Sequence, residues 1–382
     1  MSTIRLGVIG YGGRARTMVR IMREIGGAAL AAVADPNAAA IAAGMPEGEA
    51  EPVRFYADAD EMLDAERLDG VVIGTRCGLH AKMALKVLAR GVALYLEKPI
   101  ATNMADLAAL RDAASPRALV SLPLRVSALV RKAKELLEED RIGEIQHIQA
   151  VCDVPYGSTY FQNWYRDENE TQGLFLQKAS HDFDYINFLL GGNKPVAVTA
   201  MTSKQVFKGE HPAGLKCMDC PEKFTCLESP YHAWRAEPLP ADAPSSLMCA
   251  FAVDTGNEDS GSALIRYASG MHVSYSQNFF VKGAAGRRGA RLIGYRGTID
   301  FDWFTDTLTL SPHHGGQVQT YELKDVDGHG GGDQILGRNF LEMIRGESES
   351  LSPLTEAIEA NLICLKARES ALTGRLQVVE FD

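Results

Sequence analysis

Short, mostly apolar segments alternate with helical segments over the first third of the chain. Turns rich in Gly, Asp or Pro separate them, and the helical segments repeat apolar residues every three or four positions. This alternation predicts right-handed strand–helix–strand crossovers and a doubly wound parallel sheet, a Rossmann-type α/β domain. The predicted strands are 4–9, 28–34, 53–55, 70–74, 92–96 and 119–122, and the predicted helices are 15–25, 59–63, 80–89 and 104–113.

The pattern changes after about residue 122. Most later strands alternate apolar and polar residues, which is typical of a large, mainly antiparallel sheet in an α+β domain. A polar, aromatic loop (156–170) and a Pro-, Cys- and His-rich excursion (204–247) interrupt the pattern, and the C-terminal helices could pack back on the first domain. The predicted strands are 145–151, 196–202, 262–267, 271–280, 291–294, 298–301 and 307–311, and the helices are 127–139, 173–190, 334–344 and 355–372.

Length and composition narrow the class of protein. The 382 residues exceed one ordinary core and are divided into domains 1–122 and 123–382. The net charge is −10 and basic residues form no block, which disfavours nucleic acid as a partner. Apolar runs are too short or too charged to cross a membrane. The N-terminus lacks the pattern of a secretion signal and the seven cysteines are scattered, so we expect a cytoplasmic protein.

A glycine-rich turn follows the first predicted strand. Gly10-Tyr11-Gly12-Gly13-Arg14-Ala15 fits G-x-G-x-x-G/A and opens a helix, whose N-terminal N–H groups can bind a pyrophosphate. Asp35 ends the second strand, where a carboxylate can accept hydrogen bonds from ribose hydroxyls. Asp35 would repel a 2′-phosphate, so NAD is favoured as the cofactor, although Arg14 could reach the added phosphate of NADP.

With these motifs in order, the chain resembles the Gfo/Idh/MocA oxidoreductases along nearly its whole length. The resemblance implies an open-faced sheet below the nicotinamide, a sugar, polyol or related substrate, and association through the outer sheet face into a homodimer or homotetramer. It also implies that Thr75, Arg76 and His80 lie at the cofactor. The residues that carry it are Gly10-Tyr11-Gly12, Ala34-Asp35-Pro36, Thr75 with His80, Glu97-Lys98-Pro99, Arg141–Ile145, His181-Asp182-Phe183-Asp184, and Ala367–Ala371 with Gly374-Arg375.

The implied reaction is hydride transfer between a carbinol carbon and the nicotinamide, which also moves the hydroxyl proton. Lys98 is expected to stabilise the developing alkoxide and could release a proton if desolvated. His181 is the expected acid or base, because imidazole exchanges protons near neutral pH. Asp184, one turn later, could orient the imidazole or a substrate hydroxyl. Glu97 is expected to contact the nicotinamide ribose or to support its turn.

The sequence departs from the family pattern at two positions before His181, Gln177 and Ala179, the second of which is commonly Gly. Gln177 stands where family members commonly carry Asp and cannot hold charge, whereas Lys178 could take over part of that electrostatic role. These departures leave two alternatives to a sugar or polyol dehydrogenase. One is an NAD-retaining enzyme that cleaves glycosides through transient oxidation, and the other is a non-catalytic dinucleotide-binding sensor.

Several other residues are candidates for binding substrate or cofactor. Arg76 could stack on adenine or pair with a phosphate, and Arg125 could reach the mouth of the site. Trp164 and Tyr165 lie in an aromatic, polar loop of a kind that faces sugar rings. His329 could reach the pocket just before a C-terminal helix, which Asp333 could instead cap.

A cysteine cluster lies in the excursion. Cys217, Cys220 and Cys226 are closely spaced, and His211 or His232 could supply a fourth ligand for structural zinc. A second C-x-x-C is absent from the sequence, so reduced loop thiols are the favoured interpretation and no metal is assigned.

Overall fold

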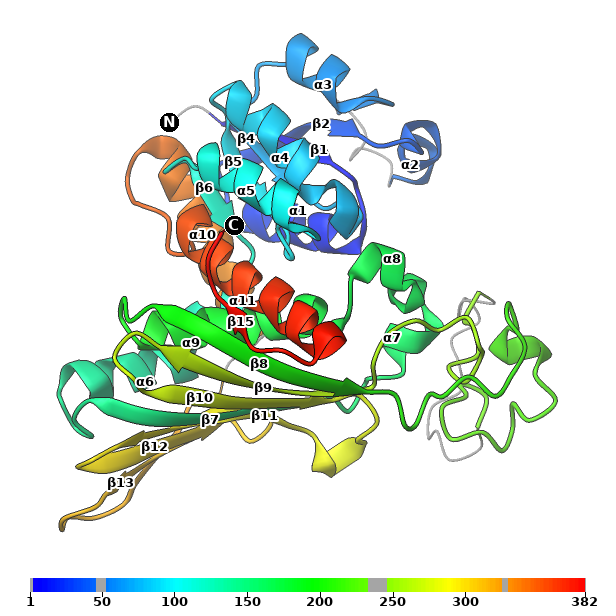
Figure 1. Cartoon of the computed structure of the whole chain (residues 1–382). Helices are drawn as coiled ribbons and strands as arrows, with labels where there is room; N and C mark the ends of the chain where they lie inside the picture. Colours follow the sequence, from blue (N-terminus) through cyan, green and yellow to red (C-terminus); the bar gives the residue numbers. More distant parts are fainter. Residues whose placement is uncertain (1–2, 46–52, 233–245, 325–328, 382) are drawn as a thin grey trace.

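The structure, a computed structural model, describes residues 3–45, 53–232, 246–324 and 329–381. Two sheets organise it, a six-stranded sheet in the upper part of Figure 1 and a nine-stranded sheet below. This arrangement confirms the predicted fold of a Rossmann domain followed by a domain built on a large, mainly antiparallel sheet. Within the described ranges, none of the helices combines the length and apolar character needed to span a membrane.

The first sheet is parallel throughout, with the order β3-β2-β1-β4-β5-β6. Every residue of β4 and β5 is buried, because helices cover both faces, and this explains why the strands are apolar without alternation. The strands are β1 (Ile4–Ile9), β2 (Ala28–Ala34), β3 (Arg54–Tyr56), β4 (Gly70–Ile73), β5 (Ala93–Leu96) and β6 (Ala118–Val120), and the helices are α1 (Gly13–Ile25), α2 (Ala38–Gly44), α3 (Ala59–Ala65), α4 (His80–Ala89) and α5 (Met104–Asp112).

The second sheet has the order β14-β13-β12-β11-β7-β10-β9-β8-β15, and only the β7–β10 pair is parallel among its described pairs. Alternate residues of β9 are buried, as expected for a sheet with one covered face. The strands are β7 (Ile145–Asp153), β8 (Pro195–Ser203), β9 (Ser260–Tyr267), β10 (His272–Asn278), β11 (Arg287–Gly294), β12 (Gly297–Asp302), β13 (Thr307–Pro312), β14 (Gln319–Glu322) and β15 (Gln377–Val378).

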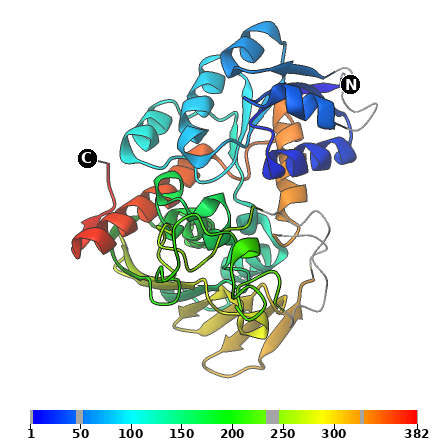
Figure 2. The same ribbon diagram turned by 90° about the vertical axis from the view of Figure 1, so that its right-hand side faces the viewer.

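Helices cover the face of this sheet that points toward the Rossmann domain, as Figures 1 and 2 show for α11 (red), which lies between the two sheets. Helix α11 contacts α5 above and β8 and α9 below, and α10 packs on α1. Tyr95 of β5 and Phe340 of α10 meet edge to face, with ring centroids 5.5 Å apart. The helices of this half are α6 (Ala128–Glu138), α7 (Thr159–Gln162), α8 (Glu168–Thr171), α9 (Ser180–Leu189), α10 (Gly332–Arg345) and α11 (Leu354–Thr373).

The single helix predicted over 173–190 is two elements in the structure. A π-helical turn, Phe175–Ala179, precedes the regular helix α9. Its five residues are all buried, and such turns occur often at functional sites because they redirect backbone and side-chain groups. The turn lies directly before His181, which begins the candidate site.

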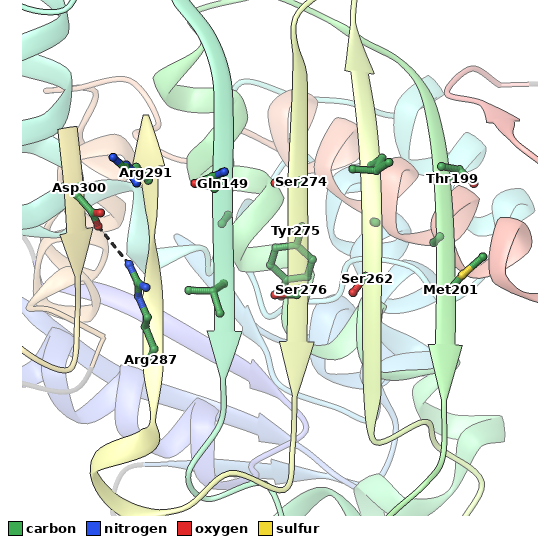
Figure 3. A pocket seen from close by; sticks show the side chains of 15 residues that line it. Gln149, Thr199, Met201, Ser262, Ser274, Tyr275, Ser276, Arg287, Arg291 and Asp300 are labelled. Carbon is green, nitrogen blue, oxygen red and sulfur yellow. Dashed lines mark hydrogen bonds and ion pairs between the residues drawn. The ribbon is translucent and has the colours of Figure 1, made fainter. Parts of the chain in front are cut away.

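The opposite face of the large sheet carries a shallow depression of about 560 Å³. Figure 3 shows the side chains that project from neighbouring strands there, including Gln149, Ser274 and Ser276, with Arg287 and Asp300 paired at one side. The Arg287 Nη2 to Asp300 Oδ1 distance is 3.3 Å. This depression lies on the side of the sheet away from the Rossmann domain, so it is separate from the candidate active site.

Candidate active site

The glycine turn between β1 and α1 fits a dinucleotide pyrophosphate. Gly10 has φ +79°, and a Cβ there would lie 2.7 Å from the Thr75 backbone, so only glycine is accommodated. A Cβ on Gly74 would lie 2.8 Å from the Ala15 methyl, which shows how closely α1 approaches the end of β4. Helix α1 starts at Gly13 without a side-chain cap, and that glycine faces open space. The N-terminal N–H groups are therefore available to an anion.

Asp35 lies beside this turn. Its Oδ2 accepts a hydrogen bond from the Tyr11 N–H at 3.0 Å, and its Oδ1 accepts one from the Asn37 N–H at 2.8 Å. The two bonds fix the carboxylate at the end of β2, where its remaining lone pairs can accept hydrogen bonds from ribose hydroxyls.

Arg14 points away from this position. Its Nη1 and Nη2 each lie 2.9 Å from an oxygen of Asp333 on α10, and its Nε donates to Glu97 at 3.2 Å. Glu97 is buried and receives this bond in the described structure. Arg14 therefore links the cofactor turn to α10 and to the end of β5, and the geometry gives no support for a contact with a 2′-phosphate.

The predicted Thr75 and Arg76 lie in the loop after β4, and the predicted His80 is the first residue of α4. His80 is buried, with Nδ1 2.7 Å from the Pro99 carbonyl and Nε2 3.1 Å from the Thr75 carbonyl. Its imidazole therefore ties together the loops that follow β4 and β5. The Cζ of the Arg76 guanidinium lies 4.1 Å from the ring centroid of Trp164, so this cation lies over the indole ring.

Lys98 and His181 lie in one neighbourhood, as the sequence predicts. The Lys98 ammonium donates to the backbone carbonyl of Gln177 at 2.8 Å, and Gln177 is four residues before His181. Burial, together with the positive charge of Lys178, lowers the pKa of Lys98 to about 8. Lys98 can therefore exchange a proton close to physiological pH.

His181 is 4% exposed and lies at the start of α9. Burial and then the charges of Lys98 and Arg288 lower the pKa of His181 well below its ordinary value, so the imidazole is neutral. Its Nδ1 is buried without a hydrogen-bond partner among the residues that the structure describes. The ring centroid of His329 lies 5.8 Å away, and His329 Nδ1 is 3.0 Å from Asp333 Oδ2. The imidazole thus has one buried nitrogen, Nδ1, that no described group satisfies.

The π-helical turn presents its side chains in different directions. The Gln177 amide donates to the Thr171 carbonyl at 3.0 Å. The Lys178 ammonium donates to the Tyr156 hydroxyl at 2.6 Å and lies 4.9 Å from the centre of the same ring. Gln177 therefore contributes its backbone carbonyl to the Lys98 contact, whereas the Lys178 ammonium lies beside a phenol.

Arg125 and Asp184 were expected to face substrate, and in the structure they face each other. Arg125 Nε lies 2.8 Å from Asp184 Oδ2, and Nη2 lies 2.5 Å from Oδ1. Arg125 Nη1 also donates to Glu356 of α11 at 2.5 Å. Both side chains of the Arg125–Asp184 pair are 1% exposed, so the pair joins α9 and α11 in the interior instead of reaching the mouth of the site.

The aromatic loop brings Trp164 and Tyr165 together, with stacked rings whose centroids are 3.9 Å apart. Sequence reasoning did not single out Tyr156, Arg288 or Asp182. Arg288 Nε donates to Asp182 at 2.9 Å beneath His181, and both residues are buried. The contact between Arg288 of β11 and Asp182 of α9 depends on the register of the sheet, which the sequence does not reveal. Only Tyr156 had a signal in the sequence, because it is the first residue of the predicted polar, aromatic loop 156–170.

The cysteine-rich excursion is only partly described, because 233–245 lie outside the described residues. The Cys217 thiol donates to the Met248 carbonyl at 3.2 Å, and the described thiols are all free. No group of three or more His, Cys, Asp or Glu side chains in the described ranges is arranged to hold a metal ion.

Comparisons with known proteins show the family of the chain. A family model described as "Oxidoreductase family, NAD-binding Rossmann fold" matches residues 4–121, and a second, described as "GFO/IDH/MocA C-terminal domain", matches 130–300. The chain belongs to the Gfo/Idh/MocA family. Its first domain is the family's NAD-binding Rossmann domain.

Individual members of the Gfo/Idh/MocA family are distant in sequence. The putative oxidoreductase YteT of Bacillus subtilis is 26% identical over 74% of each chain. An inositol 2-dehydrogenase of Rhizobium meliloti is 27% identical over 56% of this chain and 62% of its own length. A levoglucosan dehydrogenase solved with NADH and levoglucosan has a TM-score of 0.75 and 18% identity, over 98% of this chain and 99% of that one. The last similarity shows the shared fold.

Proposed function

We propose that this protein is an NAD-dependent dehydrogenase that acts on a hydroxyl-bearing carbon of a sugar, polyol or sugar derivative. The observation that supports this most strongly is the Lys98 ammonium, which is bonded to the Gln177 carbonyl one turn before His181 and has a pKa of about 8. A family of oxidoreductases with an NAD-binding domain supplies the class of reaction. Relatives named inositol 2-dehydrogenase and levoglucosan dehydrogenase support a polyol or sugar substrate.

Bound NAD supplies the hydride acceptor for the carbinol carbon. The chain's own groups then have to move the hydroxyl proton. In oxidation the neutral Lys98 amine takes this proton, and in reduction the Lys98 ammonium returns it. His181 is neutral, so it can hold the hydroxyl by a hydrogen bond without adding charge.

NAD is proposed over NADP. The Asp35 carboxylate is fixed at the end of β2 by two backbone N–H groups, so a 2′-phosphate there would meet an anion that cannot swing away easily. Arg14, the cation that could offset this repulsion, is held by Asp333 and Glu97.

The stacked Trp164 and Tyr165 rings, with Arg76 on the indole, are proposed as part of the sugar-binding surface, because aromatic faces pack on sugar C–H groups while polar groups take the hydroxyls.

We also propose that copies of the chain associate as a homodimer or homotetramer through the open face of the large sheet. Met201 and Leu264, 80% and 52% exposed, project from this face.

The test is NADH formation at 340 nm with NAD or NADP and a panel of sugars and inositols. We expect reduction of NAD by at least one compound of the panel and a weaker rate with NADP. Absence of reduction with every compound would contradict the proposal. Release of nitrophenol from nitrophenyl glycosides without net NADH would instead favour redox-neutral glycoside cleavage.

A further inference from the structure

Two lysine side chains meet at the same π-helical turn of the proposed active site, Lys98 through a bond to its backbone and Lys178 as one of its residues, and neither is paired with a carboxylate among the described residues. Lys98 is bonded to the Gln177 carbonyl at 2.8 Å, and Lys178 to the Tyr156 hydroxyl at 2.6 Å. Both of these acceptors are neutral. No ion pair to Lys98 or Lys178 occurs within the described part of the chain. Since an ammonium has three donors, each of these groups has two left over.

The acidic side chains nearby are already matched to other cations. Glu97 receives Arg14, and Asp333 receives Arg14 and His329. Asp182, under His181, is bonded to Arg288 and to the Tyr275 hydroxyl. None of these carboxylates is therefore free to neutralise the two lysines.

The positive charge is also poorly solvated. Lys178 is 5% exposed, and Lys98 is close enough to it that the charge of Lys178 lowers the pKa of Lys98. Buried charges without partners are costly, and the oxidised nicotinamide would bring a further positive charge to the same region. Tyr156 is half exposed, so the Lys178–Tyr156 pair borders solvent and not the core. A ligand that enters the site can therefore approach this pair.

We propose that the substrate of this site carries an anionic group, a carboxylate or a phosphate, which binds Lys178 while its reacting hydroxyl lies at Lys98 and His181. This inference rests on the proposed function, because it names the class of sugar on which the dehydrogenase acts. One ammonium is enough to serve a developing alkoxide, so the second indicates a negative charge that is present throughout the reaction. The anionic group supplies the acceptors that the two remaining N–H donors of Lys178 lack.

The test compares matched neutral and anionic compounds. D-glucose, D-galactose and myo-inositol are assayed against D-glucuronate, D-galacturonate, glucose 6-phosphate and myo-inositol 1-phosphate, by NADH formation at 340 nm. We expect an anionic member to exceed its neutral counterpart in kcat/KM by about 100-fold, in keeping with a desolvated charge-assisted contact. Comparison of kcat/KM between the uronates and the phosphates shows whether the bound anion is a carboxylate or a phosphate.

The variant Lys178→Met should reduce this ratio of anionic to neutral kcat/KM to within a few-fold of one, while Lys178→Arg should retain most of it. The ratio is independent of the protonation state of Lys98, because that state affects both substrates alike. Lys82→Met, which removes an exposed lysine of α4, is the matched control and should leave the ratio unchanged.

Thermal shift of the NAD complex with the same compounds measures binding without turnover. If neutral sugars reduce NAD as well as or better than every anionic one, the inference is overturned and the dehydrogenase proposal stands. If no compound reduces NAD, the dehydrogenase proposal fails. The thermal shift then decides separately whether Lys178 binds an anionic ligand. Stabilisation by an anionic compound that Lys178→Met abolishes supports it, and no stabilisation by any anion overturns it.

Discussion

The chemistry proposed for this protein depends on the environment of one lysine. A lysine in water has a pKa near 10.5, and burial next to Lys178 lowers the pKa of Lys98 to about 8. The same surroundings lower the pKa of His181 well below its ordinary value. The residue expected from sequence to titrate near neutral pH is therefore neutral, and Lys98 is the group that changes its protonation state in the working range.

This assignment predicts the pH dependence of oxidation. Because Lys98 must be neutral to accept the hydroxyl proton, kcat/KM for oxidation should rise about tenfold per pH unit below pH 8 and level off above it. The reduction direction requires the ammonium, so its kcat/KM should stay level below pH 8 and fall about tenfold per pH unit above it. Initial rates from pH 5.5 to 10 test this, and an inflection near pH 6.5 would instead indicate that His181 titrates.

Lys178 should set the position of that inflection. Lys178→Met removes a neighbouring positive charge, so the pKa of Lys98 should rise and the inflection should move to higher pH. Lys178→Arg keeps the charge and should leave the inflection close to that of the unsubstituted protein. A pH profile that is the same in all three proteins would show that the charge of Lys178 does not act on Lys98.

At the scale of elements, the site depends on how α1, α9 and α10 are joined. Arg14, in the cofactor turn at the start of α1, holds Asp333 in the first turn of α10 with two bonds of 2.9 Å. Burial disfavours the charge of Asp333, but the bonds from Arg14 and the contact with His329 outweigh it and lower the pKa of Asp333. The carboxylate therefore contributes stability above its ordinary pKa, and this contribution is lost as the pH falls through the lowered value.

Removal of this link should destabilise the fold. Arg14→Met leaves the mostly buried Asp333 without its main partner, and we expect a loss of about 2 kcal/mol in the free energy of unfolding. Urea denaturation at pH 7 measures the change. Arg20→Met, on the exposed side of the same helix, breaks a surface pair with Glu24 and should cost no more than about 0.5 kcal/mol. Equal effects of the two substitutions would contradict the structural role of Arg14.

Much of this architecture could be predicted from the sequence, for identifiable reasons. The strands β2, β4 and β5 are apolar throughout, β1 is apolar except for Arg5, and the turn at Gly10 needs a positive φ that favours glycine. The π-helical turn Phe175–Ala179 has no comparable signal, because its residues have the same apolar spacing as the helix that follows. The edge strand β15 has only two residues, too few for a periodic pattern.

The candidate site was predictable only in part. The motifs indicated Lys98 and His181, and the structure brings them together through the Gln177 carbonyl, a backbone group that no side-chain motif identifies. Arg125 and Asp184 carry charges that suit a substrate, but they satisfy each other in the interior. Pairing of this kind depends on the packing of α9 against the start of the second domain, which is not a local property of the sequence.

At the scale of the whole molecule, the large sheet has one face covered by helices and one face that no described helix covers, as Figure 1 shows. The open face presents Met201 and Leu264 among small polar side chains, with the Arg287–Asp300 pair at one side. The open face of a nine-stranded sheet is suited to bind the same face of a second copy of the chain.

A charge on this face should therefore weaken association. Met201→Glu places a carboxylate on the proposed interface and should shift the protein toward monomer in size-exclusion chromatography with light scattering. Phe224→Glu is the control, because Phe224 is similarly exposed (63%) but lies in the excursion and outside the depression. A monomeric unsubstituted protein, or an oligomer indifferent to Met201→Glu, would contradict this proposal.

The central claim is that Lys98 moves the proton that accompanies hydride transfer to bound NAD. The most direct measurement is NADH formation in a single turnover by Lys98→Met, saturated with NAD and with the best substrate of the panel. The account predicts an NAD dissociation constant within about threefold of the unsubstituted protein and a rate about 10²- to 10⁴-fold lower. A variant that binds NAD and forms NADH at the unsubstituted rate would contradict it.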